Sequence, residues 1–274
     1  MNRKKRIFYI AGTAILLAAL ILGICLTGRA GSGESIKEMM RDAVLHEENR
    51  IALFGGFTVN PGLISAYTVT GILLFIGILL RIFLIPRFKE IPGKAQLLLE
   101  TVVGLFDHLA QSNSPHRNHF LGAYVFSAGV YIFSSTLFEL LGLQAVSTAG
   151  QSLSLPAPLS DINGAIAMGC VSYLVILSGG IVSNGLRGVG STLKEFSLPI
   201  SMSFRLFGAM LSGLLVTELV YAYIQLSFVL PVFVAVMFTL LHALIQTYVL
   251  TMLTALFYGE VSEPHAAVSH KKKG

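Results

Sequence analysis

Long uncharged stretches constrain this chain more than any other feature. No Asp, Glu, Lys or Arg occurs from Leu219 to Gly259, although a transmembrane helix needs only about 20 apolar residues. The stretch is too long for one span, and Gln225 and Pro231 favour a turn within it. We predict helices at about 196–226 and 230–258, each ~43–46 Å long against a hydrocarbon core of ~30 Å. Such a hairpin must tilt strongly or project from the membrane.

The overall composition is that of a membrane protein. Hydrophobic residues make up 54% of the chain and charged residues 12%, whereas soluble domains carry about 25% charged residues. Further apolar runs predict spans at about 62–85, 119–141 and 161–186. We therefore expect an all-α, polytopic transmembrane fold. The net charge of +5 comes from short basic clusters between apolar runs, a pattern typical of membrane proteins and not of nucleic-acid binding.

The two ends of the chain differ from its middle. Residues 1–28 begin with a basic cluster, which is followed by an uncharged run from Ile7 to Gly28. This pattern fits either a cleaved signal peptide or a retained transmembrane helix. We predict that residues 29–60 form an external polar segment, 61–264 the membrane domain and 265–274 a basic cytoplasmic tail.

The distribution of basic residues predicts the orientation. With residues 1–6 in the cytoplasm, the segments on that side hold fourteen of the nineteen Lys and Arg residues, and the external segments hold four. The positive-inside rule then predicts six spans with both ends inside, or five spans with an external N-terminus if the first is cleaved. Between the spans, Lys94–Gln111 is predicted to be an amphipathic helix at the membrane surface, and 187–194 a cytoplasmic connection.

One charge lies inside the apolar region. Arg205 has no acidic residue near it in sequence between Glu195 and Glu218. A charge at membrane depth costs at least ~2.5–3.5 kcal/mol, and such residues usually face a pathway or a protein partner. An arginine that snorkels to the lipid headgroups is the alternative. We favour the functional interpretation, because Lys194 and Glu195 already mark the polar end of the segment.

Small residues surround this arginine on a helical wheel. Within about 60° of Arg205 lie Ser201, Gly208, Ala209 and Ser212. Because small residues let another backbone come close, this strip predicts a second helical surface that approaches the arginine. Glu218 lies on the opposite side of the same helix.

Further polar side chains mark a candidate ion pathway. Thr239, His242 and Gln246 share one face of the last helix, where a histidine can exchange a proton and a glutamine can bind water. Hydrogen bonds that only hold the bundle together are the alternative. Asp161 and Asn163 begin a span, where Asp161 is expected to cap the helix or to line a water-filled opening. The candidate ion-pathway residues are Glu218, His242, Gln246, Asp161, Asn163 and Glu195.

The sequence carries no enzyme or metal signature. It has no glycine-rich phosphate loop, His-Glu-x-x-His motif or Gly-x-Ser-x-Gly motif. His108, His116 and His119 lack the cysteine or carboxylate that would complete a recognisable ligand set. Cys25 and Cys170 lie far apart in apolar stretches and are predicted to be small buried side chains. We expect no metal, no cofactor and no catalysis by this chain alone.

The sequence around the arginine resembles a known family. Leu198–Met210, LPISMSFRLFGAM, is similar to the Ser-x-x-x-Arg-Leu-Phe-Gly signature of subunit a of F-type ATP synthases. Other stretches follow in the family's order: IPGKAQLLLE at 91–100, LLGL at 140–143, PAPLSDIN at 156–163 and IQTYVLTMLTALFYGE at 245–260. The resemblance covers about residues 60–265.

The resemblance implies a membrane stator subunit with five spans and a long tilted final hairpin. Its partners would be the c-ring rotor subunits, the peripheral-stalk subunit b, the rest of the ATP synthase and membrane lipid. It would lie in a bacterial plasma membrane with its C-terminus in the cytoplasm. In the family, two offset half-channels lead protons to and from the carboxylates of the rotating ring, and the arginine separates them. Arg205 would take that role, with Gln246 beside it, and proton flow would be coupled to ATP synthesis or hydrolysis.

Three positions depart from the family's pattern. Ala209 stands where the family usually has asparagine, and Leu214 where it usually has an acidic residue or histidine. Glu218, one turn further along, could supply that carboxylate. Glu139 also stands at a position where asparagine is common. These changes leave the detailed polar route and the coupling ion, proton or sodium, open.

Two other classes of protein remain as alternatives. An independent secondary transporter could use Arg205 to bind an anionic substrate. Such a protein often shows two matching halves, which this sequence lacks. An intramembrane enzyme would need paired reactive groups at depth, for which the chain offers only Glu218 and His242.

Overall fold

The computed structural model describes residues 51–53, 57–116, 119–146, 152–222 and 230–263. The helices are α3 (Pro61–Leu79), α4 (Lys94–Asn113), α5 (His119–Phe138), α6 (Ile162–Lys194), α7 (Ser197–Ala222) and α8 (Leu230–Ser262). Short helical turns are η2 (Leu80–Leu84), η3 (Ile85–Arg87), η4 (Glu139–Leu141) and η5 (Pro158–Ser160). Two antiparallel hairpins pair β1 (Ile51–Leu53) with β2 (Phe57–Val59) and β3 (Gln144–Val146) with β4 (Ser152–Ser154). The predictions for residues 1–50, for the turn at 225–227 and for the tail at 265–274 fall outside the described residues.

Four helical segments are long and apolar enough to cross a membrane, counted over the described residues. They are Pro61–Arg87, His119–Leu141, Ile162–Gly185 and Val236–Ser262, in the same order as four of the predicted spans. α7 is not among them over its described residues, but it packs along both α6 and α8. The prediction of a polytopic, helical membrane fold is confirmed, because the strands are only three residues long and the membrane-length segments are all helical.

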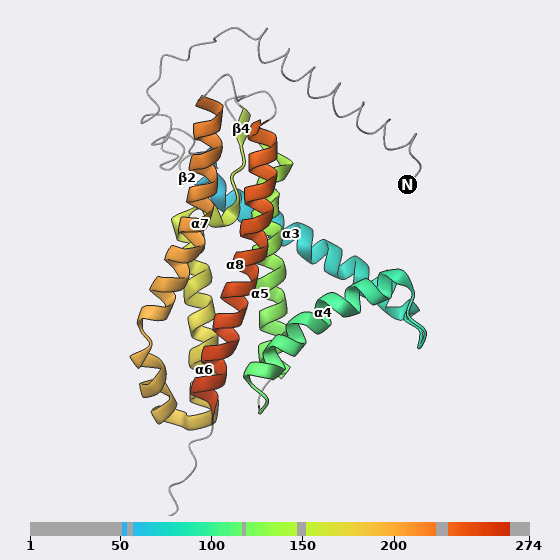
Figure 1. Cartoon of the computed structure of the whole chain (residues 1–274), viewed down its shortest axis with the longest axis vertical. Coiled ribbons are helices and arrows are strands. Elements are labelled where there is room, and N and C mark those ends of the chain that lie inside the picture. The colour runs from blue at the N-terminus through green and yellow to red at the C-terminus, as the bar shows by residue number, and fades with distance from the viewer. Residues whose placement is uncertain (1–50, 54–56, 117–118, 147–151, 223–229, 264–274) are drawn as a thin grey trace, which may run out of the picture.

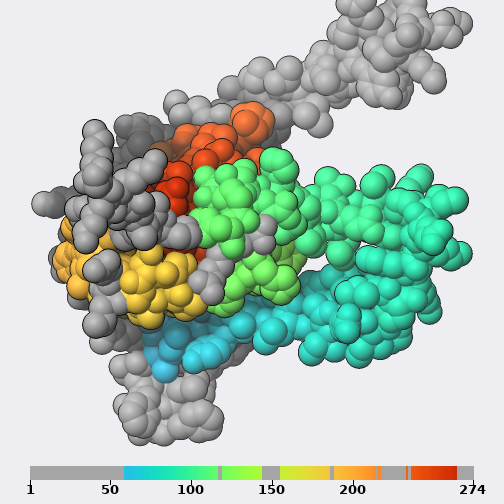
Figure 2. All heavy atoms as spheres, turned by 90° about the horizontal axis from the view of Figure 1, so that it is seen from below, coloured from blue at the N-terminus to red at the C-terminus, as the bar shows by residue number. Residues whose placement is uncertain are grey.

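Helices α5 to α8 stand side by side, whereas α3 and α4 leave this bundle (Figure 1). α3 touches the bundle at its N-terminal end, where Pro61, Ser65 and Val69 are buried. α4, which confirms the predicted helix at 94–111, returns and packs on α5 through Phe106 and Ala110. Seen from below, the arm of α3 and α4 projects from one side of the bundle (Figure 2). Since its exposed side chains are largely apolar, the arm suits lipid or a protein partner.

Small residues let the helices of the bundle approach closely. Gly129 of α5 lies under the ring of Phe106, and Gly179 of α6 lies under the ring of Tyr258. The apolar core fills the remaining space between helices and includes Leu121, Val125, Ile132, Ala165, Ile176, Met202, Leu206, Met210, Leu250 and Ala255. In lipid, helix association depends on such close packing, because the surrounding acyl chains are as apolar as the helix surfaces.

The expected connection at 187–194 is helical, a feature that the sequence pattern did not indicate. α6 continues to Lys194 through one non-helical residue, Gly185, with φ 57° and ψ −137°. Only glycine adopts this backbone conformation readily, because it has no Cβ. Gly185 therefore reverses the chain without ending the helical structure on either side of it.

The second part of α6 folds back on the first. A Cβ on Gly180 would lie 3.0 Å from the carbonyl oxygen of Gly188, and the hydroxyl of Tyr173 donates to the carbonyl of Thr192 at 3.1 Å. Tyr173 precedes the reversal at Gly185 by about three helical turns, or ~18 Å. The segment around Thr192 therefore lies well inside the bundle, away from its end.

Cys170 corrects a sequence-based prediction. Its side chain is exposed on α6, where it lines an apolar cavity of about 280 Å³ together with Phe196 and Phe204. A membrane helix is apolar on its lipid-facing side as well as in its core, so hydrophobic neighbours in sequence do not indicate which face is buried.

Candidate functional site

Arg205 lies on the outward face of α7. Its side chain is exposed, and none of the described carboxylates pairs with it. Of the predicted small strip, Ser201, Gly208 and Ser212 are exposed and Ala209 is half-buried. No atom lies within 4 Å of the position that a Cβ on Gly208 would occupy. The strip is therefore open to a neighbour along the described part of the helix.

The opposite face of α7 anchors the helix in the bundle. Leu198, Met202, Leu206 and Met210 recur every four residues and are at most 8% exposed. Beside them, a Cβ on Gly169 of α6 would come within 2.9 Å of the carbonyl oxygen of Pro199, so the two backbones touch. Because one face is held in this way, the arginine is directed away from the core.

The polar side chains of α8 lie against the bundle. Thr239 and Gln246 are buried and His242 is half-buried. A Cβ on Gly213 of α7 would lie 3.6 Å from Nδ1 of His242, so this imidazole packs against α7. Oε1 of Gln246 is buried and has no hydrogen-bond partner among the described residues. An unsatisfied buried polar group costs ~1–3 kcal/mol, which makes Gln246 an expensive residue for a purely structural role.

The contact between Gly213 and His242 sets the register of the two antiparallel helices. One turn further along α8, Gln246 is level with Ala209, whose methyl group cannot donate a hydrogen bond. Arg205 is level with the next turn of α8, ~6 Å from the level of Gln246. The histidine, the glutamine and the arginine therefore lie at successive levels along α7 and α8, with the arginine on the outward face of α7.

The sequence model of the family described as ATP synthase A chain matches residues 65–259, about seven-tenths of the chain. This chain belongs to the ATP synthase subunit a family. The resemblance inferred from the sequence is thereby confirmed. The matched region contains α7 and nearly all of α8, including Arg205, His242 and Gln246.

Two relatives carry the name ATP synthase subunit a. The protein from Tolumonas auensis is 24% identical over 267 residues, which cover 86% of this chain and 100% of the relative. The protein from Cereibacter sphaeroides is 23% identical over 183 residues, which cover 62% of this chain and 70% of the relative. The similarity thus extends over the whole of one relative and over 70% of the other.

Asp161 and Asn163 lie where α3 and α6 begin. Oδ1 of Asp161 accepts the backbone N–H of Asn163 at 3.1 Å, which is the predicted helix cap. Oδ2 accepts from the side-chain amide of Asn60 at 2.9 Å, and Asn60 in turn caps α3 by accepting the N–H of Gly62 at 3.0 Å. The pair ties the two helix starts together. Asn60 escaped the sequence analysis, although an asparagine directly before Pro61 is a typical helix start.

Glu195 follows the folded-back part of α6. Its side chain is half-buried, and its N–H donates to the carbonyl of Thr192 at 3.0 Å. Because the carbonyl of Thr192 accepts a hydrogen bond from Tyr173, the nearby Glu195 lies at a level within the helical bundle and not at the end of the bundle. Glu218 lies in the last part of α7, and its side chain is outside the described residues.

The far end of α8 is held from two sides. A hydrogen bond of 2.9 Å joins Nε2 of His116 to Oγ of Ser262. The side-chain amide of Asn184 donates to the carbonyls of Val261 and Glu263 at 3.0 and 2.9 Å. Sequence reasoning missed this role, since residues 116, 184 and 262 carry no shared pattern. Their contact exists because the reversal after Asn184 lies beside the end of α8.

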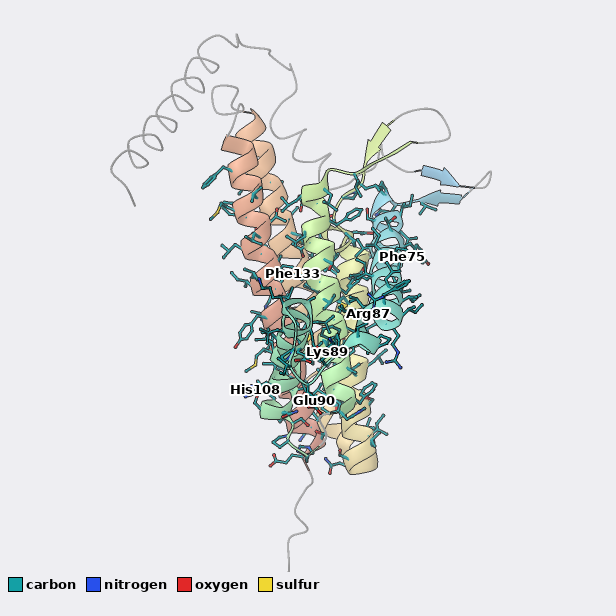
Figure 3. All side chains as sticks on the ribbon, turned by 90° about the vertical axis from the view of Figure 1, so that its right-hand side faces the viewer. Phe75, Arg87, Lys89, Glu90, His108 and Phe133 are labelled. Carbon is teal, nitrogen blue, oxygen red and sulfur yellow. The ribbon has the colours of Figure 1, made fainter. Side chains whose placement is uncertain are left out.

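An apolar cavity of about 610 Å³ lies between α4, α5 and α8. His108 and Phe133, both labelled in Figure 3, line it together with Leu105, Phe106 and Leu244. His108 thus lies at this cavity, while His116 binds Ser262. The lining is almost entirely apolar, which makes this cavity unsuitable as a route for a hydrated ion.

Proposed function

We propose that this chain is the stator subunit of an F-type ATP synthase that conducts protons through two half-channels. The protons reach and leave the carboxylates of a rotating c-ring, and their flow is coupled to ATP synthesis or hydrolysis. The chain performs no chemistry on a nucleotide. Membership of the ATP synthase subunit a family supports the proposal, and one observation carries it: the exposed Arg205 on a strip of small residues.

The small strip explains how the arginine meets the ring. Ser201, Gly208 and Ser212 leave the α7 backbone accessible on both sides of Arg205. A ring helix can therefore come close to the guanidinium and slide past it. A bulky side chain in this strip would keep the two helices apart.

Electrostatics gives the arginine its function. Its guanidinium stays charged at all relevant pH values, and it favours the ionised form of a carboxylate beside it. At 4 Å and an effective dielectric constant of ~20, two opposite unit charges attract by about 4 kcal/mol. A ring carboxylate that reaches Arg205 must therefore release its proton, and the fixed cation repels any ion that would pass directly between the half-channels.

The remaining polar residues are assigned to the two routes. On the external side, Asp161, Asn163 and the turns of α8 that carry His242 and Gln246 lead toward the arginine. On the cytoplasmic side, Glu195 is the candidate, because it is half-buried beside the folded-back part of α6. Glu218 is a further candidate on α7.

Partners and location follow from the same proposal. The c-ring lies against the Arg205 strip, and the peripheral-stalk subunit b and other ATP synthase subunits contact further faces of the bundle within membrane lipid. The chain lies in a bacterial plasma membrane with its C-terminus in the cytoplasm, because the basic residues gather on that side.

The proposal is tested by Arg205→Ala in the assembled complex. We expect ATP-driven acidification of inverted membrane vesicles to disappear, while the subunit still inserts and co-purifies with its partners. Arg87→Ala is the matched control, since Arg87 is an exposed arginine in the connection between α3 and α4 (Figure 3). Normal acidification with Arg205→Ala would contradict the proposal. A wild-type protein that co-purifies without ring or ATPase would favour the transporter that binds an anion at Arg205.

A further inference from the structure

Glu139 is a carboxylate that faces inward at the end of a membrane span. It begins the turn η4, which closes when the N–H of Gly142 donates to the carbonyl of Glu139 at 3.2 Å, with Gly142 at φ 55°. In this turn Leu140 and Leu141 are 37% and 64% exposed. Glu139, by contrast, is half-buried and lies next to the buried Phe138. An ordinary solvated turn would direct the carboxylate outward and the leucines inward.

The carboxylate of Glu139 has no stabilising partner within the described part of the chain. No described side chain or backbone group forms a hydrogen bond or an ion pair with it. Leaving a charged group at membrane depth unpaired is costly, and acidic residues in such positions usually belong to a proton or ion route. A structural role gives no reason to keep a carboxylate here.

The register of α5 and α8 shows which residues Glu139 is near. Val130 and Phe133 of α5 line the same cavity as Thr247 and Leu244 of the antiparallel α8. Continuing this register by six residues places Glu139 level with residue 238, and η4 packs on α8. His242 is one turn further along α8, ~6 Å away along the helix axis.

His242 is the titratable side chain of α8 that lies nearest to the level of Glu139. On α5, which also packs on η4, the nearest titratable group is Tyr131, two turns earlier. The register between Gly213 and His242 puts the backbone of α7 at residue 218 at the same depth as Glu139. One turn of α8 beyond His242 lies Gln246, whose buried Oε1 has no hydrogen-bond partner among the described residues, and Arg205 is level with the following turn.

We propose that Glu139 is the proton-binding carboxylate of the external half-channel and passes its proton to His242. The proposal deepens the stator function proposed above and rests on it. A proton from external water binds the carboxylate, which becomes neutral. The acid then releases the proton to a ring nitrogen of His242, directly or through water, and regains its negative charge. His242 passes the proton on toward the ring carboxylate through water bound at Gln246, and only O–H and N–H bonds change.

This role also accounts for the departure at Leu214. The α7 position where the subunit a family usually has an acidic residue or histidine is leucine in this chain. The half-channel needs a group that binds and releases protons, and Glu139 provides one from η4, on the external side of His242 and Gln246. The acidic function has thus moved from α7 to η4, the turn that follows α5.

The test is Glu139→Gln in the full complex, which keeps the shape of the side chain and removes its ability to bind a proton. We measure proton flux through membranes stripped of ATPase, driven by a potassium diffusion potential, and normalise it to the amount of assembled complex. A positioned proton carrier contributes a factor of 10² or more, so we expect the flux to fall at least about tenfold. Glu139→Asp, which keeps the carboxylate, should restore more than half of the wild-type flux.

Matched variants separate the outcomes. Glu90→Gln changes an exposed glutamate in the connection between α3 and α4 (Figure 3) and should leave the flux unchanged. Wild-type flux in Glu139→Gln would overturn the inference. An equal loss of flux in Glu139→Asp and Glu139→Gln would also overturn it, because the flux would then depend on the shape of the side chain and not on its ability to bind a proton. If Glu218→Gln stops the flux and Glu139→Gln does not, the carboxylate of the route is on α7.

Arg205→Ala is measured in parallel. Normal pumping in that variant overturns the proposed function, whereas its loss together with normal flux in Glu139→Gln overturns only the role of Glu139.

Discussion

The open strip around Arg205 makes Gly208→Leu an informative substitution. Nothing lies within 4 Å of the position that a Cβ on Gly208 would occupy, and the residue is exposed. The isolated subunit has room for the leucine, and a helix interior gains up to about 1 kcal/mol when glycine is replaced by a better helix former. Folding of the subunit should therefore be unharmed. The ring helix that approaches Arg205 would instead meet the added side chain.

The expected loss can be worked from the charge separation. If leucine holds the ring carboxylate at ~7 Å from the guanidinium instead of ~4 Å, the attraction at an effective dielectric constant of ~20 falls from about 4.2 to about 2.4 kcal/mol. The difference of ~1.8 kcal/mol corresponds to a factor of about 20 in the equilibrium that ionises the ring carboxylate. We expect ATP-driven acidification, normalised to assembled complex, to fall by about this factor.

Gly77→Leu is the control for Gly208→Leu. Gly77 is an exposed glycine of α3, and no atom lies within 4 Å of its Cβ position either. Both variants add the same side chain to an outward helix face, but only one lies beside Arg205. Equal acidification in the two variants would refute the reasoning, because the small strip would then not face the rotor.

Two further substitutions test the polar groups of the bundle. Gln246→Leu removes the buried Oε1 that has no described partner, so the thermal stability of the detergent-solubilised subunit should stay equal or rise by up to ~1–3 kcal/mol, while proton pumping falls. A loss of stability with intact pumping would show that Gln246 is a structural residue. Asp161→Ala removes the cap of α6 and the hydrogen bond from Asn60, so the subunit should lose ~0.5–2 kcal/mol of stability. Asp161→Asn retains a capping oxygen and should lose less in the same thermal unfolding assay. Equal losses in the two variants would mean that the charge of Asp161, and not its cap, stabilises the helix start.

Much of the fold was predictable from local sequence patterns. The spans at 119–141 and 161–186 were predictable because a bilayer demands about 20 apolar residues that satisfy their own backbone hydrogen bonds, and only a helix does so within one segment. The amphipathic period of α4 and the cap at Asp161 are equally local, since each depends on residues within four positions of one another.

The reversal at Gly185 was not predictable from local pattern. The glycines and charges of GLRGVGSTLKE predict a connection between two spans but do not indicate that it is helical. The structure makes it helical because Gly188 can approach Gly180 and because Tyr173 and Thr192 form a hydrogen bond. These partners lie eight and nineteen residues apart, so their contact exists only after the chain has folded back.

The sequence by itself determined that this is a polytopic helical protein with one arginine in a strip of small residues. Charge and side-chain volume are properties of single residues, and a helical period of 3.6 places them on a face without further knowledge. Only the tertiary structure decided which face is covered. Apolar residues line both the core and the lipid side of a membrane helix, so burial depends on the neighbouring helix. That is why Met202 and Met210 are buried behind Arg205 while Cys170 is exposed, and why η4, which begins at Glu139, packs on α8.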